Sequence, residues 1–226
     1  MLFSFLLLGL FVGLKHALEA DHVSTVATLA SRSASARQTV GVAAAWGVGH
    51  AAALTALGAA LIALGATLPP AVAGAFEAAV GLILIALGIG VLRRVRRRRV
   101  HLHVHEHDGA AHLHAHAHEE SGAHDHFHGA PLWRRSLLIG GVHGLAGSAA
   151  VTVLALPAGS TARAFLYLLA FGAGSVLGMV ALSAVVSLPL RLSSRHSGWA
   201  WTGLQCSLGI VDLALGTWIV LQSKVF

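Results

Sequence analysis

The feature that most constrains this chain is a group of ionisable side chains inside an apolar run. Residues 1–30 are largely apolar except for the stretch Lys15-His16-Ala-Leu-Glu19-Ala-Asp21-His22. An apolar segment of about 18 residues or more is typical of a membrane-spanning helix. Ionisable groups at that depth cost about 2.5–3.5 kcal/mol each on insertion scales, and they persist where they face a cavity, a partner charge or a substrate. We therefore predict a polar site inside the bilayer at residues 15–22, enclosed by the rest of the chain.

The composition supports an all-α integral membrane protein. The chain is 56% hydrophobic and 11% charged, whereas a soluble domain carries about 25% charged residues. The net charge of +6 comes largely from six arginines between Arg93 and Arg99, directly after an apolar segment. That placement is typical of a topology signal and not of a nucleic-acid surface. The expected partners are therefore the lipid bilayer and the cargo, with no nucleic acid.

Six apolar segments each reach the roughly 20 residues that cross the hydrocarbon core. They cover approximately residues 2–29, 40–64, 71–92, 133–156, 164–188 and 199–221. Between the third and fourth segments, the composition changes to arginine and then to histidine with interspersed acids. Such a tract cannot build a packed core. We predict three regions: a first three-helix repeat over 1–92, a disordered Arg/His-rich cytoplasmic loop over 93–131, and a second three-helix repeat over 132–226.

The two halves resemble each other at a nearly constant offset. Gly13-x-x-His16 matches Gly140-x-x-His143 at an offset of 127, and Gly47-x-Gly49 matches Gly172-x-Gly174 at 125. Two glycines of the third span also match two of the sixth at an offset of 128: Gly81 and Gly88 with Gly209 and Gly216. Because each half has an odd number of spans, the halves must have opposite orientations, and inverted repeats of this kind are typical of transporters.

The halves differ in their polar residues. His143, Ser148 and Ser175 occupy the places that correspond to His16, Asp21 and His50 in the first half. We therefore expect one strong ligand cluster, contributed mainly by the first half, with the second-half residues in supporting positions.

The distribution of basic residues predicts the orientation. Twelve arginines lie on the side that carries the loop after the third span, whereas the side of the termini carries two basic residues. Positively charged loops stay in the cytoplasm. We expect a multi-pass protein of the cell inner (plasma) membrane, with both termini outside and the histidine tract in the cytoplasm.

Four side chains are the candidate metal ligands, namely His16, Asp21, His22 and His50. Imidazole nitrogen suits nickel, cobalt, zinc and copper, whereas thiolate and thioether ligands would indicate copper(I) or zinc. The chain has only two methionines and a single cysteine, Cys206, which is remote from the motif. Magnesium prefers oxygen ligands. The predicted cargo is a divalent late transition metal, and we expect no cofactor.

The spacing of the ligands constrains the backbone. On an ideal helix, Asp21 lies about 140° and His22 about 240° from His16 around the axis. Either the backbone between them is bent or unwound, which is tolerated where it lines a cavity, or some of them have other roles. Lys15 and Glu19 are spaced i,i+4, and we expect them to form a structural ion pair. For His143 we favour a polar contact between helices.

The histidine tract is expected to bind metal weakly, by composition. Its eleven histidines are His101, His103, His105, His107, His112, His114, His116, His118, His124, His126 and His128. A cytoplasmic metallochaperone is a candidate partner on that side.

The segment Lys15-His16-Ala-Leu-Glu19-Ala-Asp21-His22 resembles the H-x4-D-H signature of the nickel/cobalt transporter family, including the shorter urease-accessory-type nickel permeases. Gly49-His50 is similar to the second family motif, although Ala51 stands where serine is usual, and many members have eight spans. The resemblance implies uptake of Ni²⁺ or Co²⁺, with His16, Asp21, His22 and His50 as selectivity residues.

Three other functions stay open from the sequence. A nickel/cobalt efflux permease would use the same site, and a metal sensor would bind without transport. A membrane-embedded metalloenzyme is more remote, because the His-Glu-x-x-His string of zinc proteases is absent from the sequence.

Overall fold

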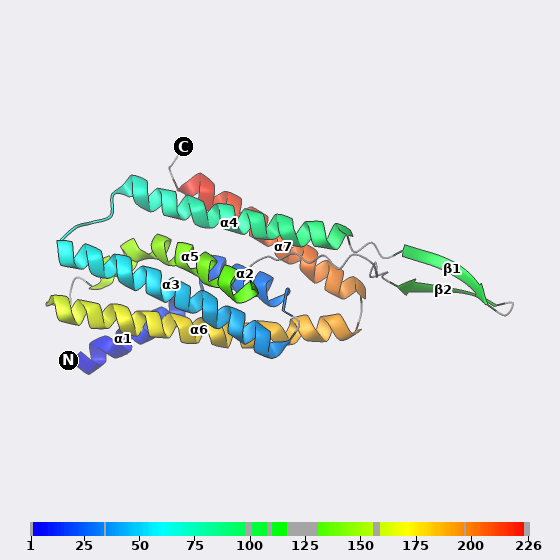
Figure 1. The fold of residues 1–226 in the computed structure, drawn as a ribbon, viewed down its shortest axis with the longest axis horizontal. Coiled ribbons are helices and arrows are strands. Elements are labelled where there is room, and N and C mark those ends of the chain that lie inside the picture. The colour runs from blue at the N-terminus through cyan, green and yellow to red at the C-terminus, as the bar shows by residue number, and fades with distance from the viewer. Residues whose placement is uncertain are drawn as a thin grey trace.

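The computed structural model describes residues 2–33, 35–97, 101–107, 110–116, 131–155, 159–196 and 198–223, and for 101–107, 110–116, 149–155, 189–196 and 198 the backbone alone. In chain order, the elements are α1 (Leu2–His16), α2 (Ala20–Ala30), α3 (Ala36–Leu64), α4 (Pro70–Arg97), β1 (His101–His107), β2 (Ala110–His116), α5 (Leu132–Ala155), α6 (Thr161–His196) and α7 (Gly198–Gln222). The helices form an elongated bundle, and the two strands extend beyond one end of it (Figure 1).

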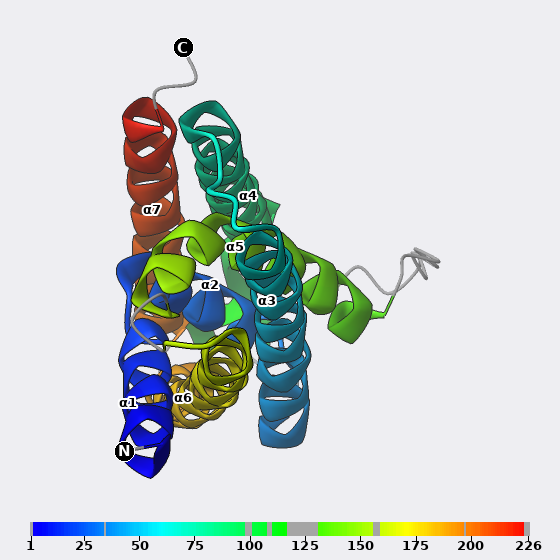
Figure 2. The same cartoon turned by 90° about the vertical axis from the view of Figure 1, so that its left-hand side faces the viewer.

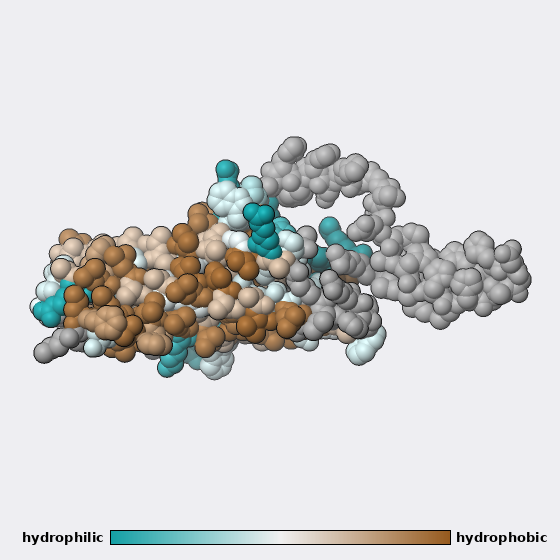
Figure 3. Space-filling view, turned by 90° about the horizontal axis from the view of Figure 1, so that it is seen from below, coloured by the Kyte–Doolittle hydropathy of each residue, from teal (hydrophilic) through white to brown (hydrophobic). Residues whose placement is uncertain are grey.

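Several helices suit a membrane. Four of them, α3, α4, α6 and α7, are long and apolar enough to cross a bilayer, and α1 and α2 together make a fifth if the bent pair is one span. The face shown in Figure 3 is mostly hydrophobic along the length of the bundle. The described residues thus form a mainly helical fold, several of whose helices have the length and composition of membrane spans. The fourth expected span, α5, is not among these candidates; its apolar run contains His143, Ser148 and several glycines.

Local sequence explains where the helices begin and end. Ser35 caps α3 by accepting a hydrogen bond from the backbone N–H of Gln38 at 3.1 Å, as short hydroxyl side chains do at helix starts. Gly65 ends α3 in the left-handed conformation with φ 58°, which glycine adopts without steric cost. Pro70 then occupies the first position of α4, where its missing N–H is not needed.

The prediction of a disordered loop over 93–131 is not confirmed by the residues that the structure describes. Residues 93–97 continue α4, and β1 pairs with β2 as an antiparallel hairpin. The physical reason is the strict alternation of histidine with other residues, because a period of two matches the side-chain period of a strand. Residues 117–130, with His118, His124, His126 and His128, lie outside the described residues.

The first expected span is broken. α1 ends at His16, α2 begins at Ala20, and the two helices meet at 61°. Of the two alternatives that the ligand spacing left open, a bent backbone is therefore present. α2 lies in the middle of the bundle (Figure 2), where it contacts α3, α4, α6 and α7. Its apolar face packs through Val26 and Leu29 onto Val42 and Trp46 of α3.

Helices far apart in the sequence pack most closely. α1 lies against α6, α3 against α5 and α6, and α4 against α7. Glycine makes these contacts close: a Cβ at Gly13 would overlap the carbonyl oxygen of Phe171, and a Cβ at Gly140 would overlap that of Trp46. Small residues at such crossings are how lipid-embedded helices approach each other.

Candidate metal centre

Three histidines from three helices converge in the interior. His16 is the last residue of α1, His22 lies in the first turn of α2, and His50 lies in the middle of α3. The ligand atoms of all three lie within 4.8 Å of one another. His22 and His50 are 2% and 0% exposed, whereas His16 is partly buried.

The ring positions suit a shared cation. Nε2 of His16 lies 3.3 Å from Nε2 of His50, and the ring centroid of His22 lies 4.4 Å from that of His16 and 5.0 Å from that of His50. Two nitrogens bound to one ion at about 2.0–2.1 Å stand about 2.9–3.4 Å apart for bond angles between 90° and 110°. The separation of His16 and His50 falls in that interval.

Two carboxylates orient two of these rings. Asp21 Oδ1 lies 2.8 Å from Nδ1 of His22, and Glu19 Oε1 lies 2.9 Å from Nδ1 of His16. A carboxylate on one ring nitrogen fixes the tautomer that leaves the other nitrogen as an acceptor, and it makes that nitrogen more basic. Nε2 of His22 is buried with no hydrogen-bond partner. Glu19, Asp21 and His22 also form a second group of candidate ligands, whose atoms lie within 4.8 Å of one another.

The break in the chain allows this arrangement. His16 and His22 lie on two helix ends that meet at 61°, so their rings approach although they would diverge on one regular helix. The hydroxyl of Ser175 donates to the carbonyl oxygen of Gly13 at 3.3 Å. This bond from α6 supports the last turn of α1, where the break begins.

His143 is a fourth imidazole close to the cluster. Its Nδ1 donates to the carbonyl oxygen of Ile139 at 3.1 Å, which leaves Nε2 as an acceptor, and Nε2 is buried without a partner. The ring lies 5.8 Å from that of His22. The hydrogen bond of His143 thus lies within α5 and not between helices as expected, while its ring packs beside the cluster.

A cavity of about 260 Å³ extends from the cluster to Gln222, the last residue of α7. His16, Asp21, His22 and His143 line its inner part. Its outer part is lined by residues near the start of α4 and the end of α7, including the exposed Glu77 and Gln222. The start of α1 and the end of α7 lie at the same end of the bundle, opposite the hairpin (Figure 1).

Two expected partners are placed differently by the structure. Glu19 pairs with His16 and not with Lys15, because the helix stops at His16 and the i,i+4 geometry is lost. The hydroxyl of Ser148 donates to the carbonyl oxygen of Leu145 at 2.7 Å within α5.

Two acidic residues were not predicted from the sequence. Glu77 lines the cavity, and Asp212 is fully buried on α7, where it accepts hydrogen bonds from Ser24 and Thr28. Both stand alone in apolar spans. The rule that intramembrane ionisable residues are functional candidates would have identified them if applied to every span.

The histidines of the hairpin lie away from this cluster. In the register of β1 and β2, three histidine pairs stand opposite each other: His101 with His116, His103 with His114 and His105 with His112. The hairpin extends beyond the end of the bundle (Figure 1).

The sequence is similar to that of the urease accessory protein UreH of Bacillus sp. (strain TB-90). The two are 34% identical over 199 residues, which are 86% of this chain and 81% of the relative. No family model matches the sequence. No solved structure matches it either.

Proposed function

Because the chain belongs to the nickel/cobalt permease-type family of the urease accessory protein UreH, which is a family of transporters and not of enzymes, we propose that it takes up Ni²⁺, or Co²⁺, into the cytoplasm through the histidine cluster. His16, His22 and His50 are the proposed direct ligands. Asp21 orients the ring of His22, and Glu19 orients that of His16. His143, which lines the inner part of the cavity, is an additional candidate ligand.

The convergence of three imidazoles carries this proposal. Their ligand atoms lie within 4.8 Å of one another inside the bundle, and buried imidazole nitrogens without partners are costly unless something binds them. Imidazole nitrogen favours late divalent metals over magnesium and calcium, which require oxygen ligands. The family then selects nickel or cobalt among the late metals.

The charges of the site suit a divalent cargo. Three neutral imidazoles carry no charge, so an ion bound to them would bring two positive charges into the bilayer. Asp21 and Glu19 lie on the far sides of two of these rings and supply two negative charges. A buried cation is tolerated when it is paired in this way. The pair of carboxylates therefore lowers the cost of moving the ion from water to the site.

The packing supports six spans in two inverted repeats. Gly9 lies near Tyr167 and Gly13 near Phe171, so α1 and α6 run in parallel. The equivalent pair, α3 and α5, is parallel as well. The third pair, α4 and α7, is antiparallel, with Gly81 beside Gly216 and Gly88 beside Gly209. A two-fold axis in the membrane plane would exchange the first two pairs and map the third onto itself.

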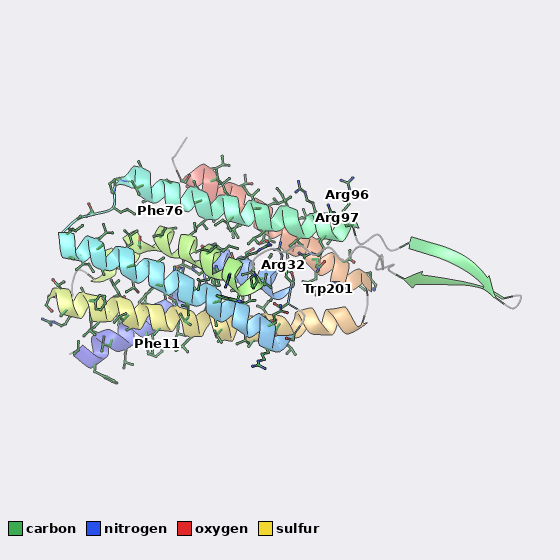
Figure 4. The ribbon with its side chains drawn as sticks, in the orientation of Figure 1. Phe11, Arg32, Phe76, Arg96, Arg97 and Trp201 are labelled. Atoms are coloured by element: carbon green, nitrogen blue, oxygen red, sulfur yellow. The ribbon has the colours of Figure 1, made fainter. Side chains whose placement is uncertain are left out.

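The position of the cavity supports uptake. It reaches the cluster from the end where α1 starts and α7 finishes. Arg96 and Arg97 lie at the opposite end, on the last turn of α4 (Figure 4). Arginine-rich ends face the cytoplasm, so the proposed conformation is open to the outside of the plasma membrane. Histidines opposite one another in β1 and β2 would then meet the ion in the cytoplasm, where a metallochaperone could collect it.

Metal flux into oriented proteoliposomes tests the proposal. We expect His22→Ala to abolish nearly all Ni²⁺ and Co²⁺ entry, because one of three ligands is lost, while the protein stays folded since a polar group leaves the bilayer. Ser207→Ala is the matched control: its hydroxyl is exposed and bonds only locally, to the carbonyl oxygen of Gly203 at 3.0 Å.

The outcomes separate the candidate functions. Wild-type flux in folded His22→Ala would contradict the site. Flux that runs only from the hairpin side to the other side would show export, and saturable binding without any flux would show a sensor.

A further inference from the structure

Asp212 is a buried carboxylate that the metal cluster does not use. It lies in the middle of α7 and is 0% exposed. Its Oδ1 accepts a hydrogen bond from Ser24, and its Oδ2 accepts one from Thr28 at 2.6 Å. Both donors belong to α2, the half-helix whose first turn carries Asp21 and His22. One carboxylate thus ties the helix of the metal site to a helix of the other half of the chain.

The contact lies on the polar face of α2 that leads away from the metal site. Asp21, Ser24 and Thr28 are spaced so that they share one face of the helix within about 60°. Thr28 lies almost two turns from Asp21, toward Arg32, which follows α2 and interacts electrostatically with Asp212. Figure 4 places Arg32 toward the hairpin end of the bundle. The polar face therefore runs from the cluster toward the proposed cytoplasmic side.

This face is closed in the structure. Ser24 is 4% exposed, and Thr25 and Thr28 are both 0% exposed, and the cavity that reaches the cluster does not include them. A static seal would be built more stably from apolar side chains, because a buried charge costs desolvation. Hydrogen bonds between hydroxyls and a carboxylate can be exchanged for water. When the helices separate, water can bond to the hydroxyls of α2 and to the carboxylate of α7.

We propose that Asp212 is a positioning residue that latches α2 to α7 through Ser24 and Thr28, and that this latch closes the route between the histidine cluster and the hairpin end. The inference rests on the proposed transport function, since a route for the ion is assumed. Opening the latch frees the polar face of α2 and hydrates it, and the ion leaves along this face. The alternative is a fixed hydrogen-bonded anchor that never opens.

The test measures access to the sealed face. Cys206 is first changed to Ser, and Thr25→Cys then provides one thiol beside the latch, because Thr25 follows Ser24, borders the polar face and is fully buried. Oriented proteoliposomes are treated with a membrane-impermeant maleimide from either side. Two latch variants are compared with this background: Asp212→Asn, which removes the charge, and Thr28→Val, which removes one donor at constant size.

We expect maleimide labelling from the hairpin side to become about tenfold faster in each variant, since each loses a hydrogen bond to a charged group. Ser183→Ala is the matched control, because it removes a buried hydroxyl that bonds only within α6, to the carbonyl oxygen of Val180 at 2.7 Å. It should leave the labelling rate unchanged.

Several results would overturn the latch. Unchanged labelling in folded Thr28→Val is one, and this variant decides the matter even if Asp212→Asn fails to fold. Equal acceleration from both sides, or in Ser183→Ala, would show general loosening. Ni²⁺ titration of the same proteins, with the eleven histidines of 101–128 replaced by glutamine, separates the two proposals. Absent binding in the background removes the histidine site, whereas intact binding with unchanged labelling removes only the latch.

Discussion

Asp21→Asn is the most informative change at the metal centre, because it alters charge while keeping shape. Asparagine retains an oxygen that can accept the hydrogen bond from Nδ1 of His22, at 2.8 Å in the structure. The direct ligands are therefore untouched. Any loss of affinity reports the electrostatic contribution of the carboxylate behind the ring.

The magnitude follows from the geometry. The hydrogen bond, the imidazole ring and a metal–nitrogen bond of about 2.0–2.1 Å place the carboxylate about 6–7 Å from a bound ion. A divalent ion at that distance gains about 5 kcal/mol at an effective dielectric constant near 20. Asp21 is 22% exposed, and water screens part of this gain. Outer-shell partners are worth about 10–100-fold in metal affinity, so we expect the Kd for Ni²⁺ to rise within that range.

Calorimetric titration of Ni²⁺ into the solubilised full-length chain measures this change. The eleven histidines of 101–128 are replaced by glutamine in every protein compared, so that only the interior site binds. Glu19→Gln is the comparator. It should cost less than tenfold, because Glu19 is 57% exposed and its charge is better screened. An unchanged Kd in Asp21→Asn, or an equal cost in Glu19→Gln, would refute the reasoning.

Three further outcomes are expected. Deleting 101–128 should keep flux but shift its dependence on metal concentration, since a long connection can be shortened at little entropic cost; a correctly inserted protein without flux would place this tract in the pathway. In the glutamine background, Ni²⁺ affinity should fall as the pH falls from about 7.5 to 5.5, because protons compete for imidazole; a flat titration would indicate an oxygen-based site. Gly13→Val should lower the melting temperature, because a Cβ at this position meets the Phe171 carbonyl oxygen and overpacking costs about 1–3 kcal/mol or more. Gly41→Ala is the control and should not lower the melting temperature, since a Cβ there has nothing within 4 Å.

The broken first span shows what spacing alone can predict. The angular positions of His16, Asp21 and His22 on one helix predicted either a bend or other roles for some of them, and the structure has a bend directly after His16. The family resemblance rested on the same few residues and is confirmed by the relative that matches 86% of the chain. Both predictions depended on residues close together in the sequence.

Interactions that depend on the bend itself were predicted less well. The expected ion pair of Lys15 and Glu19 assumed a continuous helix. Because α1 ends at His16, Glu19 pairs with His16 instead.

The structure of the histidine tract was predicted from its composition, which indicates disorder. Its alternation of histidine with other residues favours the hairpin of β1 and β2.

Contacts between residues that are far apart in the chain leave no local pattern in the sequence. Asp212 meets Ser24 across 188 positions of the chain, and nothing beside either residue marks the contact. Glu77 likewise becomes meaningful only beside the cavity that α4 and α7 form with the helices of the site. Such pairs are set by the packing of helices through small residues, which hydropathy does not specify.

The exchange of partners between the two halves has a consequence for biosynthesis. α1 packs mainly on α6 and α3 on α5, so a nascent chain that has reached the end of α4 lacks the main neighbours of both. At that stage, His16, His22 and His50 have been made, while the helices that enclose them have not. Membrane insertion must therefore hold three imidazoles in an unfinished bundle until the last third of the protein is synthesised, and nickel in the cytoplasm finds no completed site on an immature chain.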